Sequence, residues 1–208
     1  KYRSLIIGML ARKKAMLMNA GKRPTTPYSL FMTLKDGLGE MVEAAIKKSP
    51  DIQFKSSAKV KTIEKMQEGW RVQLEDGWER MADAVILATP GAITAKLLQP
   101  IAPNSAELLS SIKYVSTATV TLGYKKEGFS HSLDGFGFVV PRSEGRSILA
   151  CTWTSSKFPH RAPEGYVMLR CYLGGALQEE IAEKDEETLA ALVKKDLQEI
   201  MGIHETPV

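Results

Sequence analysis

Residues 84–88, Ala-Val-Ile-Leu-Ala, are apolar at every position, and this short run constrains the fold more than any other feature of the sequence. A strand without polar alternation is typical of a sheet buried on both faces, as parallel sheets are. Thr89-Pro90-Gly91 ends the run, and apolar residues up to Leu98 predict a short helix after it. We therefore expect a strand that returns to a parallel sheet.

The stretch before this run changes from helical spacing to a period of two at about Ile52. Apolar and polar residues alternate around Val60 and again from Trp70 to Leu74. Asp76-Gly77 is a strong hairpin signal, because both residues tolerate a positive φ. These signals predict a β-meander that leads into the apolar strand.

Helices are predicted at both ends of the chain. Apolar residues recur at helical spacing in residues 4–20, in the segment after Asp36 and from Glu186 to Met201. Asp36 is a candidate N-cap for the second of these helices. Between them lie four strand-like segments, at 114–124, 136–140, 147–153 and 166–172. The fold class expected is α+β or α/β, with a mixed sheet and flanking helices in the second half.

Composition excludes several classes of function. The net charge of +4 comes from scattered basic residues, which argues against nucleic-acid binding. Cys151 and Cys171 lack C-x-x-C spacing and the three histidines lie far apart, so neither a disulfide framework nor a metal site is expected. No apolar run reaches the length of a membrane span, so we expect a cytoplasmic protein with at most peripheral membrane contact. The G-x-G-x-x-G, P-loop and nucleophile-elbow motifs are missing, and no catalytic residue can be assigned.

Two segments carry a resemblance to a known superfamily. Ala58-Lys59-Val60-Lys61-Thr62-Ile63 and Asp83-Ala84-Val85-Ile86-Leu87-Ala88-Thr89-Pro90 resemble the internal part of the FAD domain of flavin amine oxidases. The resemblance implies a backbone contact from Val60 to the adenine half of FAD. It also implies that the second segment runs back toward the flavin and places Thr89 near the cofactor.

A narrower resemblance covers residues 136–175. The runs Phe136–Arg142, Ile148–Pro159, Arg161–Gly165 and Leu169–Gly175 are similar to bacterial protoporphyrinogen and coproporphyrinogen oxidases, as is the segment Ser29–Ala45. The resemblance implies oxidation of a porphyrinogen in haem biosynthesis, with FAD as cofactor and dioxygen or another acceptor. Phe138 and Trp153 are candidate contacts for the flat macrocycle, although a place in the sheet core fits them at least as well. Basic residues are expected to meet its propionates.

The resemblance also implies a division of the chain. Residues 1–27 would form a helical segment on the substrate or membrane side, 28–91 the internal part of the FAD domain, and 92–208 the substrate domain. The family's dinucleotide fingerprint would lie upstream of Lys1 and its closing segment downstream of Val208. We therefore expect an internal fragment, inactive alone and weak in FAD binding. An amine or carotenoid oxidase, or a non-catalytic binding module, remains an alternative, and the choice of porphyrinogen and a homo-oligomeric state stay open.

Overall fold

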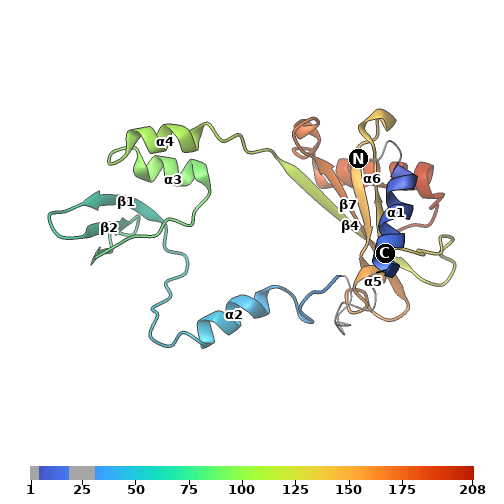
Figure 1. The fold of residues 1–208 in the computed structure, drawn as a ribbon, viewed down its shortest axis with the longest axis horizontal. Helices are drawn as coiled ribbons and strands as arrows, with labels where there is room; N and C mark the ends of the chain where they lie inside the picture. Colours follow the sequence, from blue (N-terminus) through green and yellow to red (C-terminus); the bar gives the residue numbers. More distant parts are fainter. Residues whose placement is uncertain (1–4, 19–30) are drawn as a thin grey trace.

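The computed structural model describes residues 5–18 and 31–208. Two sheet-based units are joined by an extended linker over residues 111–116, with helix α2 (Gly39–Lys47) lying before the first unit (Figure 1). The predicted N-terminal helix is present as α1 (Leu5–Met18). The remainder of the expected segment 1–27 lies outside the described residues. The α+β class predicted from the sequence is confirmed.

The first unit is built on the predicted meander. Strands β1 (Val60–Lys65), β2 (Trp70–Leu74) and β3 (Glu79–Ala82) pair in that order and antiparallel. At the predicted turn, Gly77 has a φ of +86°, and the backbone N–H of Trp78 donates to Asp76 Oδ1 at 2.9 Å. Helices α3 (Gly91–Leu98) and α4 (Pro103–Ser110) pack together, and α3 contacts β1. The three-part division of the chain remains a prediction.

The apolar run 84–88 does not form the strand that we expected. These residues have no ladder partner in the described part of the chain, and 93% of the Ile86 side chain is exposed. The reason is physical: a central strand needs a neighbour on each edge, and the described residues supply neither. Periodicity reports the burial that a segment is suited to, but does not identify its partners.

The second unit contains a four-stranded sheet, which we call the larger sheet. Its strands are β4 (Thr117–Lys125), β5 (Gly137–Val139), β6 (Ile148–Trp153) and β7 (Tyr166–Gly174). Their order is β4-β7-β6-β5, and every pairing is antiparallel, where the sequence had suggested a mixed sheet. The short helices η2 (Arg142–Glu144) and α5 (Thr154–Lys157) connect β5 to β6 and β6 to β7, and η3 (Glu179–Ile181) follows β7.

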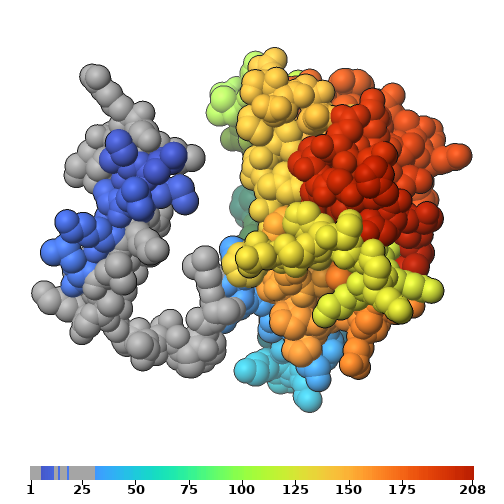
Figure 2. Space-filling view, turned by 90° about the vertical axis from the view of Figure 1, so that its right-hand side faces the viewer, coloured from blue at the N-terminus to red at the C-terminus, as the bar shows by residue number. Residues whose placement is uncertain are grey.

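Helix α6 (Glu186–Met201) covers one face of the larger sheet and ends as the sequence predicts. Asp185 caps its first turn, and Gly202 follows its last turn with a φ of +68°. Val193 and Leu197 are fully buried against the sheet. Figure 2, which looks onto this side of the molecule, shows the red segment of α6 on the surface of the second unit.

The capping prediction for the second helix was wrong. The N-cap of α2 is Leu38, which makes no side-chain capping bond, and Asp36 lies outside the helix. Helix α2 buries no residue, and Leu38, Met41 and Val42 of its apolar stripe are all more than half exposed. The stripe is real in sequence, but nothing in the described chain covers it.

Candidate functional site

The larger sheet has two faces of different character. Along its central strand β7, Val167, Leu169, Cys171 and Leu173 are buried against the core, while the alternate residues point to the other side. Because α6 packs on the core side, we call the opposite side the open face. Its residues are Thr119, Thr121, Val139, Ala150, Thr152, Met168, Arg170 and Tyr172.

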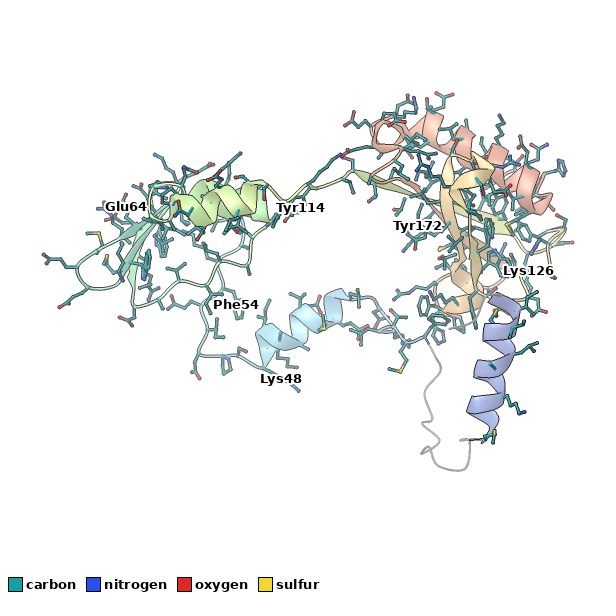
Figure 3. All side chains as sticks on the ribbon, turned by 45° about the horizontal axis from the view of Figure 1, so that its top comes forward. Lys48, Phe54, Glu64, Tyr114, Lys126 and Tyr172 are labelled. Atoms are coloured by element: carbon teal, nitrogen blue, oxygen red, sulfur yellow. The ribbon has the colours of Figure 1, made fainter. Side chains whose placement is uncertain are left out.

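Strand register arranges the open face in rows. Tyr172 lies between Thr119 of β4 and Ala150 of β6, and Ala150 in turn pairs with Val139, whose side chain is 78% exposed. The neighbouring row places Arg170 between Thr121 and Thr152. Figure 3 labels Tyr172 on the side of the sheet that is turned toward the first unit. The open face therefore carries one row in which Tyr172, Ala150 and Val139 follow Thr119, beside a polar row of Thr121, Arg170 and Thr152.

The two candidate substrate contacts from the sequence lie elsewhere. Phe138 pairs with Cys151, Trp153 pairs with Leu169, and both aromatic rings pack against the buried core. Their role as substrate contacts remains a prediction. Sequence reasoning selected them as aromatic residues. The period-two alternation of residues 166–173 separates the two faces and puts Arg170 and Tyr172 on the open face.

Trp153 has one unusual feature. Its ring lies 5.2 Å from that of His131, and its indole Nε1 is buried without a hydrogen-bond partner in the described ranges. A buried donor left unpaired costs on the order of 1–3 kcal/mol. Packing of the ring therefore holds Trp153 in place, although its indole N–H loses its hydrogen bond to water.

Arg161 ties the segment before α2 to the second unit. Its Nη2 donates to Thr33 Oγ1 and to the carbonyl oxygen of Leu34, both at 2.9 Å. The Lys157 ammonium lies 4.1 Å from the centre of the Phe31 ring, and that ring meets Phe136 edge-on at 5.1 Å. A cavity of about 400 Å³ lies between the residues of this contact. Residues 31–34 thus contact residues 136, 157 and 161, close to the start of the edge strand β5.

A larger hollow of about 890 Å³ lies at the α5 end of β7. Polar side chains line much of it, among them Lys126, His131, Ser155 and His160. His131 Nδ1 accepts a hydrogen bond from the backbone N–H of Leu133, and Ser155 Oγ accepts one from that of Met168. These bonds give both side chains a structural task in holding the loops around the hollow.

The two candidate cofactor residues both belong to the first unit. Val60 begins β1, which is an edge strand, and a register irregularity separates it from Thr62. Thr89 lies just before α3, where its Oγ1 is 2.7 Å from Thr94 Oγ1 and its carbonyl oxygen accepts from the same hydroxyl. Thr89 therefore fixes the turn into α3, and its contact with a cofactor remains a prediction.

The cysteines are not arranged for nucleophilic chemistry. Cys151 and Cys171 lie directly opposite each other on β6 and β7, and both are buried. The side-chain hydrogen bond with Cys151, together with burial, raises the pKa of the Cys171 thiol well above its ordinary value. Its thiol is protonated at neutral pH and packs as a small apolar group.

The structure describes residues 5–18 and 31–208, and neither a metal site nor a membrane span is found within them. No group of three or more His, Cys, Asp or Glu side chains there is placed to hold a metal ion. No helix within those ranges is both long and apolar enough to cross a bilayer.

Comparison with known proteins places this geometry in context. The sequence profile of the family described as flavin containing amine oxidoreductase matches residues 4–208. The chain is 33% identical over 208 residues to the coproporphyrinogen III oxidase of Bacillus subtilis (strain 168), covering all of this chain and 43% of that enzyme. It is 28% identical over 209 residues to the coproporphyrinogen III oxidase of Staphylococcus aureus (strain NCTC 8325 / PS 47), covering 99% of this chain and 44% of the enzyme.

A solved structure extends the likeness to the fold. The crystal structure of a protein of Exiguobacterium sp. 255-15, provisionally named a protoporphyrinogen oxidase, superposes with a TM-score of 0.76 at 29% identity. The match covers 93% of this chain and 40% of that one. The chain thus spans less than half the length of each of these relatives.

Proposed function

Because the chain belongs to the family of flavin containing amine oxidoreductases, we propose that it forms part of an FAD-dependent oxidase that converts a porphyrinogen to the porphyrin. The observation that carries the proposal is the alignment of all 208 residues with a coproporphyrinogen III oxidase at 33% identity. The whole protein would act on coproporphyrinogen III or protoporphyrinogen IX in haem biosynthesis.

The edge of the meander fits the cofactor role proposed for Val60. An edge strand leaves half of its backbone N–H and C=O groups without a ladder partner, and a bulge turns such groups outward. Strand β1 has both features at its first residues. FAD, when bound, would accept the hydride and pass electrons to dioxygen, the backbone at Val60 would contact its adenine half, and Thr89 would lie near the cofactor.

The open face fits the substrate role. A porphyrinogen presents an apolar ring with carboxylates at its edge, and the open face offers an apolar row (Tyr172, Ala150, Val139) beside a polar one (Thr121, Arg170, Thr152). The sheet holds these side chains at fixed spacing, so the surface is organised before the substrate binds. The protein would orient the ring and exclude water, and the bond changes would belong to the cofactor.

The test uses the full-length protein that contains this chain, loaded with FAD. Porphyrin fluorescence is followed after addition of coproporphyrinogen or protoporphyrinogen, under argon and in air, alongside oxygen consumption. Fluorescence that grows only with enzyme and air supports the oxidase and names its substrate and acceptor. Turnover of an amine or a carotenoid precursor in place of either porphyrinogen would overturn the proposal.

Location and assembly are parts of the same proposal. We place the whole protein in the cytoplasm with at most peripheral contact to a membrane, and a homo-oligomer is compatible with the fold. Cell fractionation with a salt wash and light scattering on the full-length protein measure these two properties.

A further inference from the structure

Arg170 occupies the middle of the open face. It lies on the central strand β7, between Thr121 of β4 and Thr152 of β6, and its side chain is exposed. Its Nε donates to Thr121 Oγ1 at 3.2 Å, and no other bond of its guanidinium is seen to a residue in the described chain. A guanidinium carries five N–H donors, so this bond leaves the paired Nη groups available.

Three arginines of the described residues are engaged by acidic groups or by two oxygen atoms, whereas Arg80 and Arg142, like Arg170, form no ion pair there. Arg71 is paired with Glu64, Arg146 with Asp196 and Glu199, and Arg161 with two oxygen atoms of the segment before α2. Within the described part of the chain, Arg170 forms no ion pair. It is thus a positive charge, fixed at its Nε, with the neutral residues Thr121 and Thr152 as its neighbours across the strands.

We propose that Arg170 binds a carboxylate of the substrate, with Thr121 as the residue that positions it. The inference rests on the proposed function. The apolar ring would lie over Tyr172 and Ala150, in the row about 7 Å along the strand from Arg170. The free Nη groups would then meet a propionate at the ring edge in the paired geometry that a guanidinium and a carboxylate favour.

The proposal has a consequence for substrate choice. Coproporphyrinogen III carries more carboxylate groups than protoporphyrinogen IX, so a fixed arginine favours it wherever the additional groups come within reach. A carboxylate receptor also discriminates against a substrate whose acids are esterified, because an ester offers no charge and leaves the guanidinium without its partner.

The experiment uses the full-length holoenzyme with three variants, Arg170→Gln, Arg170→Lys and Thr121→Val. A control, Arg80→Gln, removes an exposed arginine of β3 whose Nη1 donates to Gln53 Oε1. Flavin content and thermal unfolding verify that each variant folds. The rates are measured with coproporphyrinogen III, protoporphyrinogen IX and the methyl ester of the faster substrate.

We expect Arg170→Gln to lower kcat/KM for the acid by roughly 10–100-fold, mainly through KM, and to leave the ester unchanged. Arg170→Lys should restore part of the loss, since it keeps the charge without the fork. Thr121→Val should cost several-fold, and Arg80→Gln nothing.

An equal loss for acid and ester in Arg170→Gln would overturn the carboxylate contact while leaving the oxidase assignment intact. Wild-type enzyme that fails to oxidise any porphyrinogen would overturn the proposed function, and the inference with it.

Discussion

In the second unit, individual buried polar atoms determine how much stability a mutation removes. The carboxylate of Asp196 on α6 is the strongest case, because the residue is only 4% exposed. Its Oδ2 accepts hydrogen bonds from the backbone N–H groups of Ser147 and Ile148, at 2.8 and 3.0 Å. These bonds join the helix to the start of β6.

Asp196→Ala should lower the free energy of unfolding by about 2–4 kcal/mol, because it removes the acceptor of a buried N–H group (Ile148) and of a partly buried one (Ser147). Urea unfolding of the full-length protein, followed by circular dichroism, measures this difference. The control is Glu199→Ala, on the same helix, which removes a more exposed carboxylate paired with Arg146 and should cost less than about 1 kcal/mol. Equal costs for the two variants would show that the hydrogen bonds of Asp196 carry no special weight.

Trp153 separates ring packing from hydrogen bonding. Trp153→Phe removes the unpaired indole N–H and keeps most of the apolar ring, so stability should change by no more than about 1 kcal/mol. Trp153→Ala should cost about 3–5 kcal/mol through the cavity it leaves. KM of the Phe variant should stay within about twofold of wild type. A large rise in KM without loss of stability would instead place the indole at the substrate.

Only part of the arrangement of individual side chains could be predicted from the sequence. The alternation of residues 166–173 is visible in the sequence, yet which set faces α6 depends on long-range packing. Arg170 is one of many scattered basic residues in the sequence, and only strand pairing places it between two threonines. Phe138 and Trp153 stood out by residue type, which does not report the direction of a side chain on a strand.

At the scale of elements, α6 shows a helix whose limits are encoded locally. Asp185 accepts bonds from the backbone N–H and the hydroxyl of Thr188, both at 2.9 Å. The backbone hydrogen bond from Thr188, followed by the bond from its hydroxyl, holds the pKa of Asp185 below its ordinary value. Because the folded-state pKa is lowered, the stabilisation is present above the unfolded pKa of about 4 and is lost as the pH falls through the folded value.

Asp185→Ala should therefore lower Tm by roughly 2–4 °C at pH 7, and the difference from wild type should shrink as the pH falls below about 4. Asp185→Asn keeps a good N-cap without a titrating group, so its Tm should match wild type near pH 7. Thermal scans from pH 3 to 7 measure both effects. A constant difference between Asp185→Ala and wild type down to the lowest pH would contradict the linkage.

Elements that depend on distant partners were less predictable. The hairpin at Asp76-Gly77 and helix α6 follow from local rules, and the sequence located both. The run 84–88 and the stripe of α2 have apolar patterns that fit a buried place, but the described chain does not cover them. The local pattern indicates that a segment is suited to burial, and only the fold determines whether another element covers it.

At the scale of the whole molecule, the two units divide the proposed work. Val60 and Thr89 of the cofactor side lie in the first unit, and the open face lies in the second, beyond the extended linker (Figure 1). Neither unit shows, in its described residues, the glycine-rich turn at a helix N-terminus that binds a pyrophosphate in dinucleotide folds. The proposed cofactor contacts and the proposed substrate surface thus belong to different units of the chain.

The isolated chain of 208 residues should consequently bind FAD weakly or not at all. Gel filtration after incubation with FAD, with absorbance read at the flavin and protein bands, measures the bound fraction. The full-length protein is the control and should elute with flavin. A stoichiometric yellow complex of the short chain would show that its own residues suffice for the cofactor.

Strand β7 contributes to two tasks at once, since alternate residues serve the core and the open face. Its tolerance to mutation should therefore be periodic. In a saturation library of the full-length protein, changes at Leu169, Cys171 and Leu173 would reduce the amount of folded protein. Changes at Met168, Arg170 and Tyr172 would leave abundance intact and alter turnover. Mutations at every second residue of this strand would thus change substrate specificity while the core-facing residues preserve the fold.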